Sequence, residues 1–376
     1  MKRPVVLAVG VAALVAATLL GWADVRRERA FRRLISVGQS AVNRGRMVEA
    51  IEAFSGALAL KPQSMLAHLE RGDMYRRRGE LDAALRDLQE AAALDPTAPQ
   101  PLERLGDVAS ARGQHLEAAE LYARYLALDD RAARVLYKRG RSSYLAGRPA
   151  EAIDPLRKAV SLDGSLADAH FLLGMSLRAR GRHAEALPAF ERSVALREDS
   201  LDAREQLAVT YETLGRRPES LAHWEALASR EPDRPERQVA LGLAYARSGR
   251  PEAAIQTLAR AAANHPERPA ILAAIGRVWL DMADPGPDAV ALGKALDALR
   301  PAAAREGATS EVLALYGRAL LMSGNPQEAE KALERASQRF PIDPLALRYL
   351  AEAARRLGHT AVAEQAEVTY ARLTEG

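Results

Sequence analysis

The chain has 376 residues, with 53 Lys and Arg against 49 Asp and Glu, 5% aromatic residues and no cysteine. The lack of cysteine excludes disulfides, thiolate metal sites, covalent haem attachment and a cysteine nucleophile. The length suggests two or three globular domains at about 150 residues each, unless one small unit is repeated many times. Leu and Ala dominate and β-branched residues are sparse, so we expect an all-helical chain.

Residues 1–23 differ in kind from the rest of the chain. Lys2 and Arg3 precede an uncharged run, residues 5–22, which as a helix would span about 27 Å at about 1.5 Å per residue. Two interpretations compete: a retained transmembrane anchor, or a signal peptide cleaved before Asp24. We favour the anchor, because the run is longer than the apolar core of an ordinary signal peptide.

An Arg-rich segment, residues 24–30, follows the apolar run. Residues 1–33 carry seven basic and two acidic side chains, so the other residues of the chain sum to a net charge of −1. This near-neutral remainder argues against nucleic acid as a partner. Basic residues flank the apolar run on both sides. This leaves open whether the rest of the chain lies in the periplasm or in the cytoplasm. Only six of the 53 basic residues are Lys, an excess of Arg that is typical of GC-rich coding, so we expect a bacterial chain and hence a bacterial inner membrane.

Two series of small residues repeat every 34 residues along the remaining chain. The first series is Gly38, Gly72, Gly106, Gly140, Gly174, Ala208, Gly242 and Gly276, continuing at Gly317 and Ala351 after a seven-residue insertion near 283–289. The second series runs seven residues behind: Gly45, Gly79, Gly113, Gly147, Gly181, Gly215, Gly249, Gly324 and Gly358. The first series predicts a helix that a second helix approaches closely. The second series predicts the left-handed residue that ends this first helix.

Two further positions keep the same phase and predict the second helix. Twelve residues after each first-series position stands a small residue: Ala50, Ala84, Ala118, Ala152, Ala186, Ser220, Ala254, Ala295, Ala329 or Ala363, allowing for the insertion. Four residues later comes a large apolar side chain: Phe54, Leu88, Tyr122, Leu156, Phe190, Trp224, Leu258, Leu299 or Leu333. The small residue lets the two backbones approach, and the large one fills the gap beside it.

This pattern resembles the tetratricopeptide repeat, whose consensus places Gly, Tyr, Ala, a large apolar residue and Pro at these phases. The second unit shows it with Gly72, Tyr75, Ala84, Leu88 and Pro96. The resemblance implies a right-handed α-solenoid of about ten helix-turn-helix repeats over residues 31–376, after the N-terminal apolar helix. It leaves no stretch for a second domain.

No catalytic motif of the metalloprotease, α/β-hydrolase or phosphate-loop type occurs in the sequence. The histidines are scattered, and we interpret His68 and His170, which share one repeat position, as fillers of the core between helices. We therefore expect no enzymatic activity, no cofactor and no metal site.

The resemblance implies a concave groove lined by the first helix of each repeat, which receives an extended peptide or a helix of a partner protein. The family's groove positions fall here on Arg76, Arg104, Tyr137, Lys138, Arg141, Tyr144, Phe171 and Arg178. Cations beside aromatic rings suit a partner segment with acidic and apolar side chains; ordinary solvated positions are the alternative. Further along the chain the same positions become apolar, from Val239 and Leu243 to Leu321 and Met322, and that strip is either open to a partner or buried within the array.

These observations predict a membrane-anchored, non-enzymatic scaffold or adaptor that assembles a membrane or envelope complex. The alternative is an exported soluble periplasmic component of a polysaccharide-secretion or outer-membrane assembly pathway. The sequence leaves the oligomeric state open.

Overall fold

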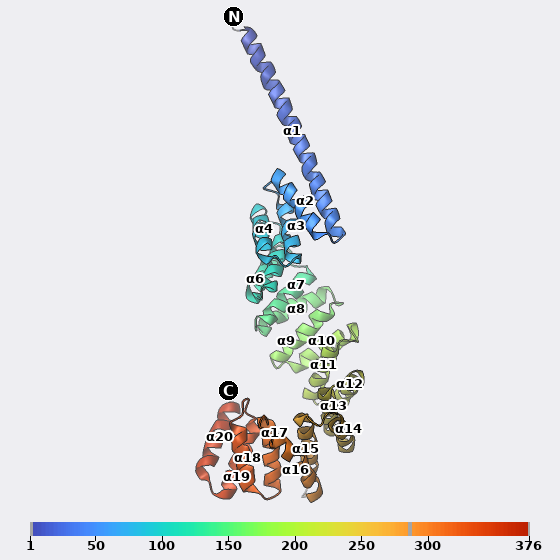
Figure 1. Ribbon diagram of the computed structural model, residues 1–376, viewed down its shortest axis with the longest axis vertical. Coiled ribbons are helices and arrows are strands. Elements are labelled where there is room, and N and C mark those ends of the chain that lie inside the picture. Colours follow the sequence, from blue (N-terminus) through green and yellow to red (C-terminus); the bar gives the residue numbers. More distant parts are fainter. Residues whose placement is uncertain (1–2, 285–287, 375–376) are drawn as a thin grey trace. The chain divides into compact units, whose positions relative to one another are not determined.

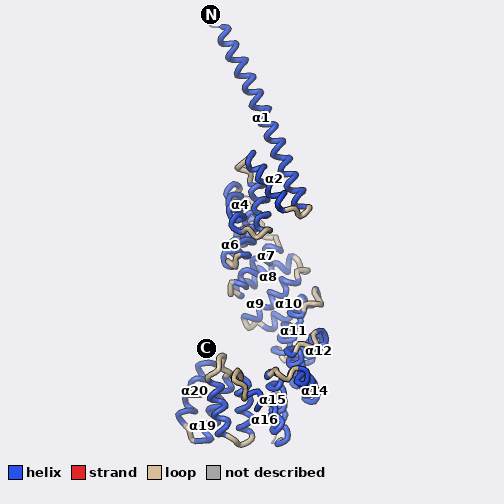
Figure 2. The backbone as a smooth tube through the Cα atoms, in the orientation of Figure 1, coloured by secondary structure: helices blue, strands red, loops and turns tan. Residues whose placement is uncertain are grey.

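The computed structural model describes residues 3–284 and 288–374, with the backbone alone for residues 3–21. In this part of the chain twenty α-helices are present and no strand (Figures 1 and 2). The helices are α1 Arg3–Asn43, α2 Met47–Leu60, α3 Met65–Arg77, α4 Leu81–Leu94, α5 Pro99–Ala111, α6 His115–Leu128, α7 Ala133–Leu145, α8 Pro149–Leu162, α9 Ala167–Ala179, α10 His183–Leu196, α11 Leu201–Thr213, α12 Arg217–Arg230, α13 Pro235–Arg247, α14 Pro251–Asn264, α15 Pro269–Ala283, α16 Ala289–Ala303, α17 Ser310–Met322, α18 Pro326–Ser337, α19 Pro344–Leu357 and α20 Thr360–Thr374.

The helices form consecutive pairs in which an odd-numbered helix packs against the even-numbered helix that follows it. The described residues therefore contain ten helix-turn-helix units, as the sequence predicted, and each first-series Gly or Ala lies in an odd-numbered helix. We call the odd-numbered member helix A and the even-numbered member helix B. The array divides into two compact units, Met1–Glu198 with α1 to α10 and Asp199–Gly376 with α11 to α20.

Local sequence sets where the helices begin and end. Several helices start at a proline, such as Pro149 and Pro235, because the first turn needs no donor from that residue and its φ is already helical. Others start after a hydroxyl side chain, as where the Ser64 hydroxyl accepts a hydrogen bond from the Ala67 amide at 3.2 Å.

The second-series glycines end helix A in nine repeats. Their φ angles lie between +71° and +82°, a left-handed conformation that costs a residue with a Cβ about 1 to 2 kcal/mol. In the fourth repeat, the Gly147 amide donates to the Tyr144 carbonyl at 3.0 Å and the Arg148 amide donates to the Ser143 carbonyl at 2.9 Å. These bonds close α7 before α8 begins, which confirms the predicted turn.

The seam between helix A and helix B is built from the predicted small and large residues. In the fourth repeat Ala152 and Leu156 are fully buried, and Leu156 packs directly over Gly140. The same Gly-over-large-residue contact recurs in seven other repeats, at Gly38, Gly72, Gly106, Gly174, Gly242, Gly276 and Gly317. Each repeat thus buries its own apolar seam, and stacking of neighbouring repeats covers the outer faces.

Helix α1 is continuous across the predicted boundaries at residues 23 and 30. It runs from Arg3 to Asn43 and ends as helix A of the first repeat (Figure 1). The predicted membrane segment, residues 5–22, falls almost entirely on residues whose side chains lie outside the described part of the structure. Among the described residues, no helix combines the length and the apolar character that crossing a bilayer requires.

The predicted insertion lies between Gly276 and Leu299. Compared with the fourth repeat, two of the seven added residues extend the end of α15, two fall in its connection to α16, and three extend the start of α16 ahead of Leu299. Residues 285–287, which belong to the predicted insertion, lie outside the described residues.

The prediction that His68 and His170 fill the core was wrong. Both are only partly buried, and the Nε2 atom of each lies close to a loop carbonyl oxygen, at 2.9 Å from Pro62 and at 3.3 Å from Gly164. Gln238 occupies the equivalent position of the seventh repeat. Its side-chain amide donates a hydrogen bond to the Pro232 carbonyl at 3.1 Å. The position therefore fastens helix A to the loop before it.

Candidate protein-binding surface

The predicted partner-binding residues lie on the first helices of repeats two to five, within the unit Met1–Glu198. Helix α3 contacts α5, and α7 contacts α9, so the first helices of successive repeats lie side by side. On α7, Tyr137, Arg141 and Tyr144 are spaced four and three residues apart and therefore share one side of the helix. We call the surface formed by α3, α5, α7 and α9 at these positions the helix A surface.

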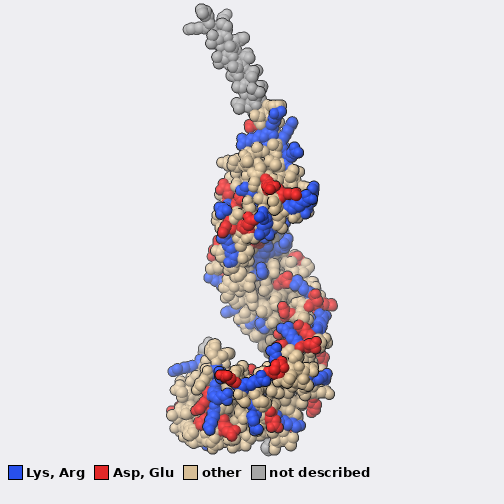
Figure 3. Space-filling model, viewed as in Figure 1, with Lys and Arg blue, Asp and Glu red and all other residues tan. Residues whose placement is uncertain are grey.

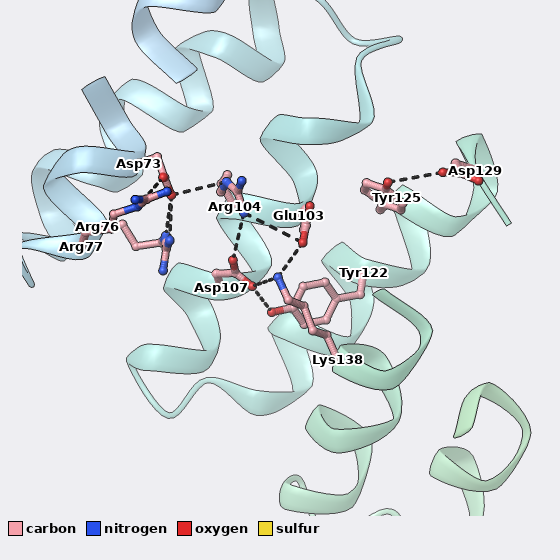
Figure 4. A network of polar contacts seen from close by, with 10 residues as sticks. All are labelled: Asp73, Arg76, Arg77, Glu103, Arg104, Asp107, Tyr122, Tyr125, Asp129 and Lys138. Carbon is pink, nitrogen blue, oxygen red and sulfur yellow. Dashed lines mark hydrogen bonds and ion pairs between the residues drawn. The ribbon is translucent and has the colours of Figure 1, made fainter. Parts of the chain in front are cut away.

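A network of ion pairs crosses the α3 and α5 part of this surface (Figure 4). The carboxylate of Asp73, which is buried, forms ion pairs with Arg76 at 2.7 Å and with Arg77 at 2.8 Å. Arg104 of the next repeat reaches the same carboxylate at 3.3 Å. Two of the predicted binding cations, Arg76 and Arg104, are thus engaged by an acid of the chain itself.

Lys138 continues the network from α7 to α5. Its Nζ lies 2.6 Å from Glu103 Oε1 and 2.7 Å from Asp107 Oδ1. The Tyr122 hydroxyl also donates to Asp107 at 2.8 Å, and burial, followed by the negative charge of Asp107, raises the pKa of Tyr122. Lys138 therefore holds two neighbouring repeats together through partly buried, charge-assisted hydrogen bonds.

Arg141 differs from these cations in its surroundings. It is exposed and forms no hydrogen bond or ion pair with any residue that the structure describes. Tyr137 lies one helical turn before Arg141, on the same side of α7. Burial raises the pKa of Tyr137, and the positive charge of Arg141 opposes that rise. Arg141 is therefore an unneutralised cation beside an aromatic side chain.

The remaining predicted residues extend this aromatic and cationic area. Tyr144 and Phe171 are partly exposed, and the Phe171 ring packs edge-on against Phe190 with centroids 6.1 Å apart. Arg178 lies in the last turn of α9 and, in the part of the chain that is described, has no ion-pair partner. The predicted cations on α3 and α5 are thus paired with acids of the chain, whereas Arg141 on α7 and Arg178 on α9 are not paired among the described residues.

Family models for the tetratricopeptide repeat match the chain over residues 38–99, 103–167 and 205–269. Two further models of the same family match residues 167–200 and 310–353. The chain belongs to the tetratricopeptide repeat family. These matches cover most of the array and agree with the ten helix pairs, so the resemblance drawn from the glycine spacing is confirmed.

Three solved structures are similar to part of the chain. The MamA protein is 26% identical over 45% of this chain and 92% of its own, with a TM-score of 0.43. YrrB, described as a TPR protein with an unusual peptide-binding site, is 24% identical over 49% of this chain and 95% of its own, with a TM-score of 0.46. Pseudomonas aeruginosa pilF is 18% identical over 56% of this chain and 96% of its own, with a TM-score of 0.48. No curated protein matches the sequence significantly.

The second unit of this tetratricopeptide repeat array does not offer the long open apolar strip that was one of the two predicted alternatives. Ala274, Leu280 and Leu321 are buried within its core, so the strip is largely covered by neighbouring repeats. Val239 and Leu243 remain partly exposed and line a cavity of about 320 Å³ together with Trp224 and Ile271.

Sequence reasoning did not indicate that acids of neighbouring repeats neutralise the predicted cations. Glu103 and Asp107 lie on α5, one helical turn apart, at the same repeat positions that carry Tyr137 and Arg141 on α7. The repeat phase identifies these positions as surface positions of helix A. It does not indicate that side chains 31 to 35 residues apart in the sequence pair with one another.

Proposed function

We propose that this tetratricopeptide repeat protein is a non-enzymatic scaffold that binds a partner protein through the α7 and α9 part of the helix A surface. The observation that carries the proposal is the exposed, unneutralised Arg141, one helical turn after Tyr137 on α7. Binding of a carboxylate costs little free energy at an exposed Arg that has no internal partner, because no existing ion pair has to break.

The partner segment that fits this area carries a carboxylate and an apolar or aromatic side chain. Arg141 and Arg178 supply guanidinium groups for the carboxylate, and Tyr144 and Phe171 supply partly exposed rings against which an apolar side chain packs. An extended peptide or an amphipathic helix both present side chains at suitable intervals. Helix pairs of the array make up nearly all of the described residues after residue 30, which supports a binding role.

We further propose that residues 5–22 hold the array at a bacterial inner membrane, where it serves the assembly of a membrane or envelope complex. The uncharged run between Arg3 and Asp24 supports this proposal. Cleavage before Asp24 would instead make the chain an exported periplasmic component. Mass determination of the mature N-terminus, together with protease accessibility in spheroplasts, decides between these outcomes and gives the side of the membrane.

Site-specific photo-crosslinking in the producing cell tests the binding surface. We expect a benzoylphenylalanine at Phe171 to form a discrete adduct with a partner protein, and Arg141→Glu in the same chain to abolish that adduct. The same probe at Leu116, an exposed position of α6 on helix B, serves as the matched control and should give no such adduct. Identical adducts at both positions, or an adduct at Phe171 that persists with Arg141→Glu, would contradict the proposal.

A further inference from the structure

The segment of α1 between Trp22 and Arg33 separates its arginines onto two sides of the helix. Trp22, Arg26, Arg29 and Arg33 are spaced four, three and four residues apart. At about 100° per residue they fall within an arc of about 60° and form a row along the helix axis. We call these four residues the outer row.

The opposite side of the same segment is engaged by the first repeat. Arg27 Nε donates to the Leu60 carbonyl at 2.6 Å. Glu28 is bound by Arg32 at 2.7 Å and also by Lys61, and the Lys61 ammonium lies 4.7 Å from the centre of the Phe31 ring. These contacts neutralise Glu28 and fix how α1 is turned relative to α2 and the loop after it.

The outer row is exposed and carries cations that the repeat does not use. The Arg26 guanidinium lies 3.5 Å from the centre of the Trp22 ring. Arg29 and Arg33 have no hydrogen-bond or ion-pair partner within the described residues. Trp22 is 56% exposed and Val25 48% exposed. Figure 3 shows Lys and Arg side chains gathered at this N-terminal end of the described surface.

We infer that the outer row binds the surface of a membrane containing anionic phospholipids. The negative potential of such a surface attracts each Arg that lies near it, and an exposed Trp next to cations suits the boundary between headgroups and acyl chains. Asp24 and Glu28, the acids of this segment, lie on the other side of the helix and do not offset the row. The exposed Trp22 and Val25 favour a lipid surface over nucleic acid, which offers no apolar layer.

This inference concerns lipid headgroups and is independent of the partner-binding surface on α7 and α9. It shares one premise with the proposal that residues 5–22 hold the chain at a membrane, because both place α1 at the bilayer. Its test therefore measures headgroup preference, which insertion of an apolar helix alone does not produce.

Quenching of Trp22 by brominated lipids measures that preference directly. The chain has three tryptophans, so Trp224→Phe with Trp279→Phe leaves Trp22 as the fluorophore. The full chain is reconstituted into vesicles of phosphatidylcholine and phosphatidylglycerol in equal amounts, with one or the other lipid brominated. At low salt we expect brominated phosphatidylglycerol to quench Trp22 at least twofold more strongly than brominated phosphatidylcholine, and the difference to disappear in about 1 M salt, where the Debye length is about 3 Å.

Two variants separate the outer row from general basicity. Arg29→Gln/Arg33→Gln should abolish the preference for phosphatidylglycerol, whereas the matched change on the opposite side, Arg27→Gln/Arg32→Gln, should retain it. Circular dichroism checks that every variant keeps its helix content. For a chain that keeps all its tryptophans, the ratio of the two lipids that remain bound after extraction in neutral detergent provides a second measurement.

Three outcomes would overturn the inference. These are equal quenching by the two lipids, a preference that the outer-row variant retains, and loss of preference in the opposite-side variant alone. A different result would assign the row to nucleic acid instead. In that case the unaltered chain binds a labelled oligonucleotide, the outer-row variant does not, and both lipids quench Trp22 equally.

Discussion

The ring of Phe190 occupies the space in which a Cβ atom of residue 174 would lie. A Cβ built on Gly174 would be 2.7 Å from Phe190 Cε1 and 2.8 Å from its Cδ1 and Cζ, well inside van der Waals contact. The Phe190 ring of α10 therefore packs directly against the backbone of α9 at Gly174. This contact explains why a residue that weakens helices recurs inside helix A.

Gly174→Ala should destabilise the protein by about 1 to 3 kcal/mol, because overpacking of the Phe190 ring outweighs the gain in helix propensity. Gly293 is the matched control, since it lies within α16 and a Cβ there meets nothing within 4 Å. Gly293→Ala should stabilise the chain by about 0.4 to 1 kcal/mol. Urea denaturation of both variants checks the difference in sign, and stabilisation by Gly174→Ala would disprove the packing argument.

Ala152→Phe should overpack the seam between α7 and α8 and lower the free energy of unfolding by about 1 to 3 kcal/mol. Ala152 is fully buried, whereas Ala150, two residues earlier on the same helix, is exposed. Ala150→Phe should therefore change stability by less than about 0.5 kcal/mol. Thermal unfolding followed by circular dichroism compares the two, and equal melting curves would show that the assigned phase of helix B is incorrect.

Charge reversal should separate binding from stability within the helix A surface. Lys138→Glu places a carboxylate against Glu103 and Asp107, so we expect a loss of about 2 kcal/mol in stability, the scale of a charge-assisted hydrogen bond. Arg141→Glu breaks no ion pair and should leave the unfolding midpoint unchanged while removing the partner adduct at Phe171. If Arg141→Glu unfolds the protein instead, the residue has a structural role and the binding assignment fails.

Protonation of His170 should weaken the fold. Burial lowers the pKa of His170, while its contact with the Gly164 carbonyl opposes the shift and the Arg192 charge adds to it. Because the folded-state pKa is lowered, the unfolded state binds the proton more readily, and stability falls as pH decreases through and below about 6.5, the ordinary imidazole pKa. His170→Gln, which copies the side chain present at Gln238, should reduce the stability difference between pH 8 and pH 5. An identical pH profile for the variant would exclude His170 as a contributor.

The sequence determined the helical pairs, their ends and their seams. A left-handed turn requires Gly, as at Gly147, and a large side chain over a close helix crossing requires Gly beneath it, as at Gly140 under Leu156. Both requirements are local and recur with the repeat, so they are visible as a 34-residue period. The same period identifies Tyr137, Arg141 and Phe171 as surface positions of helix A.

Only the tertiary structure decided which of the surface cations are available. Arg104 pairs with Asp73, and Lys138 pairs with Glu103 and Asp107, while Arg141, three residues from Lys138, stays unpaired among the described residues. Ion pairing depends on side-chain reach and on the distance between neighbouring helices, and neither quantity follows from repeat phase. The same reason explains the two sides of α1, because only the packing of α1 against Leu60 and Lys61 shows which arginines the first repeat engages and which face outward.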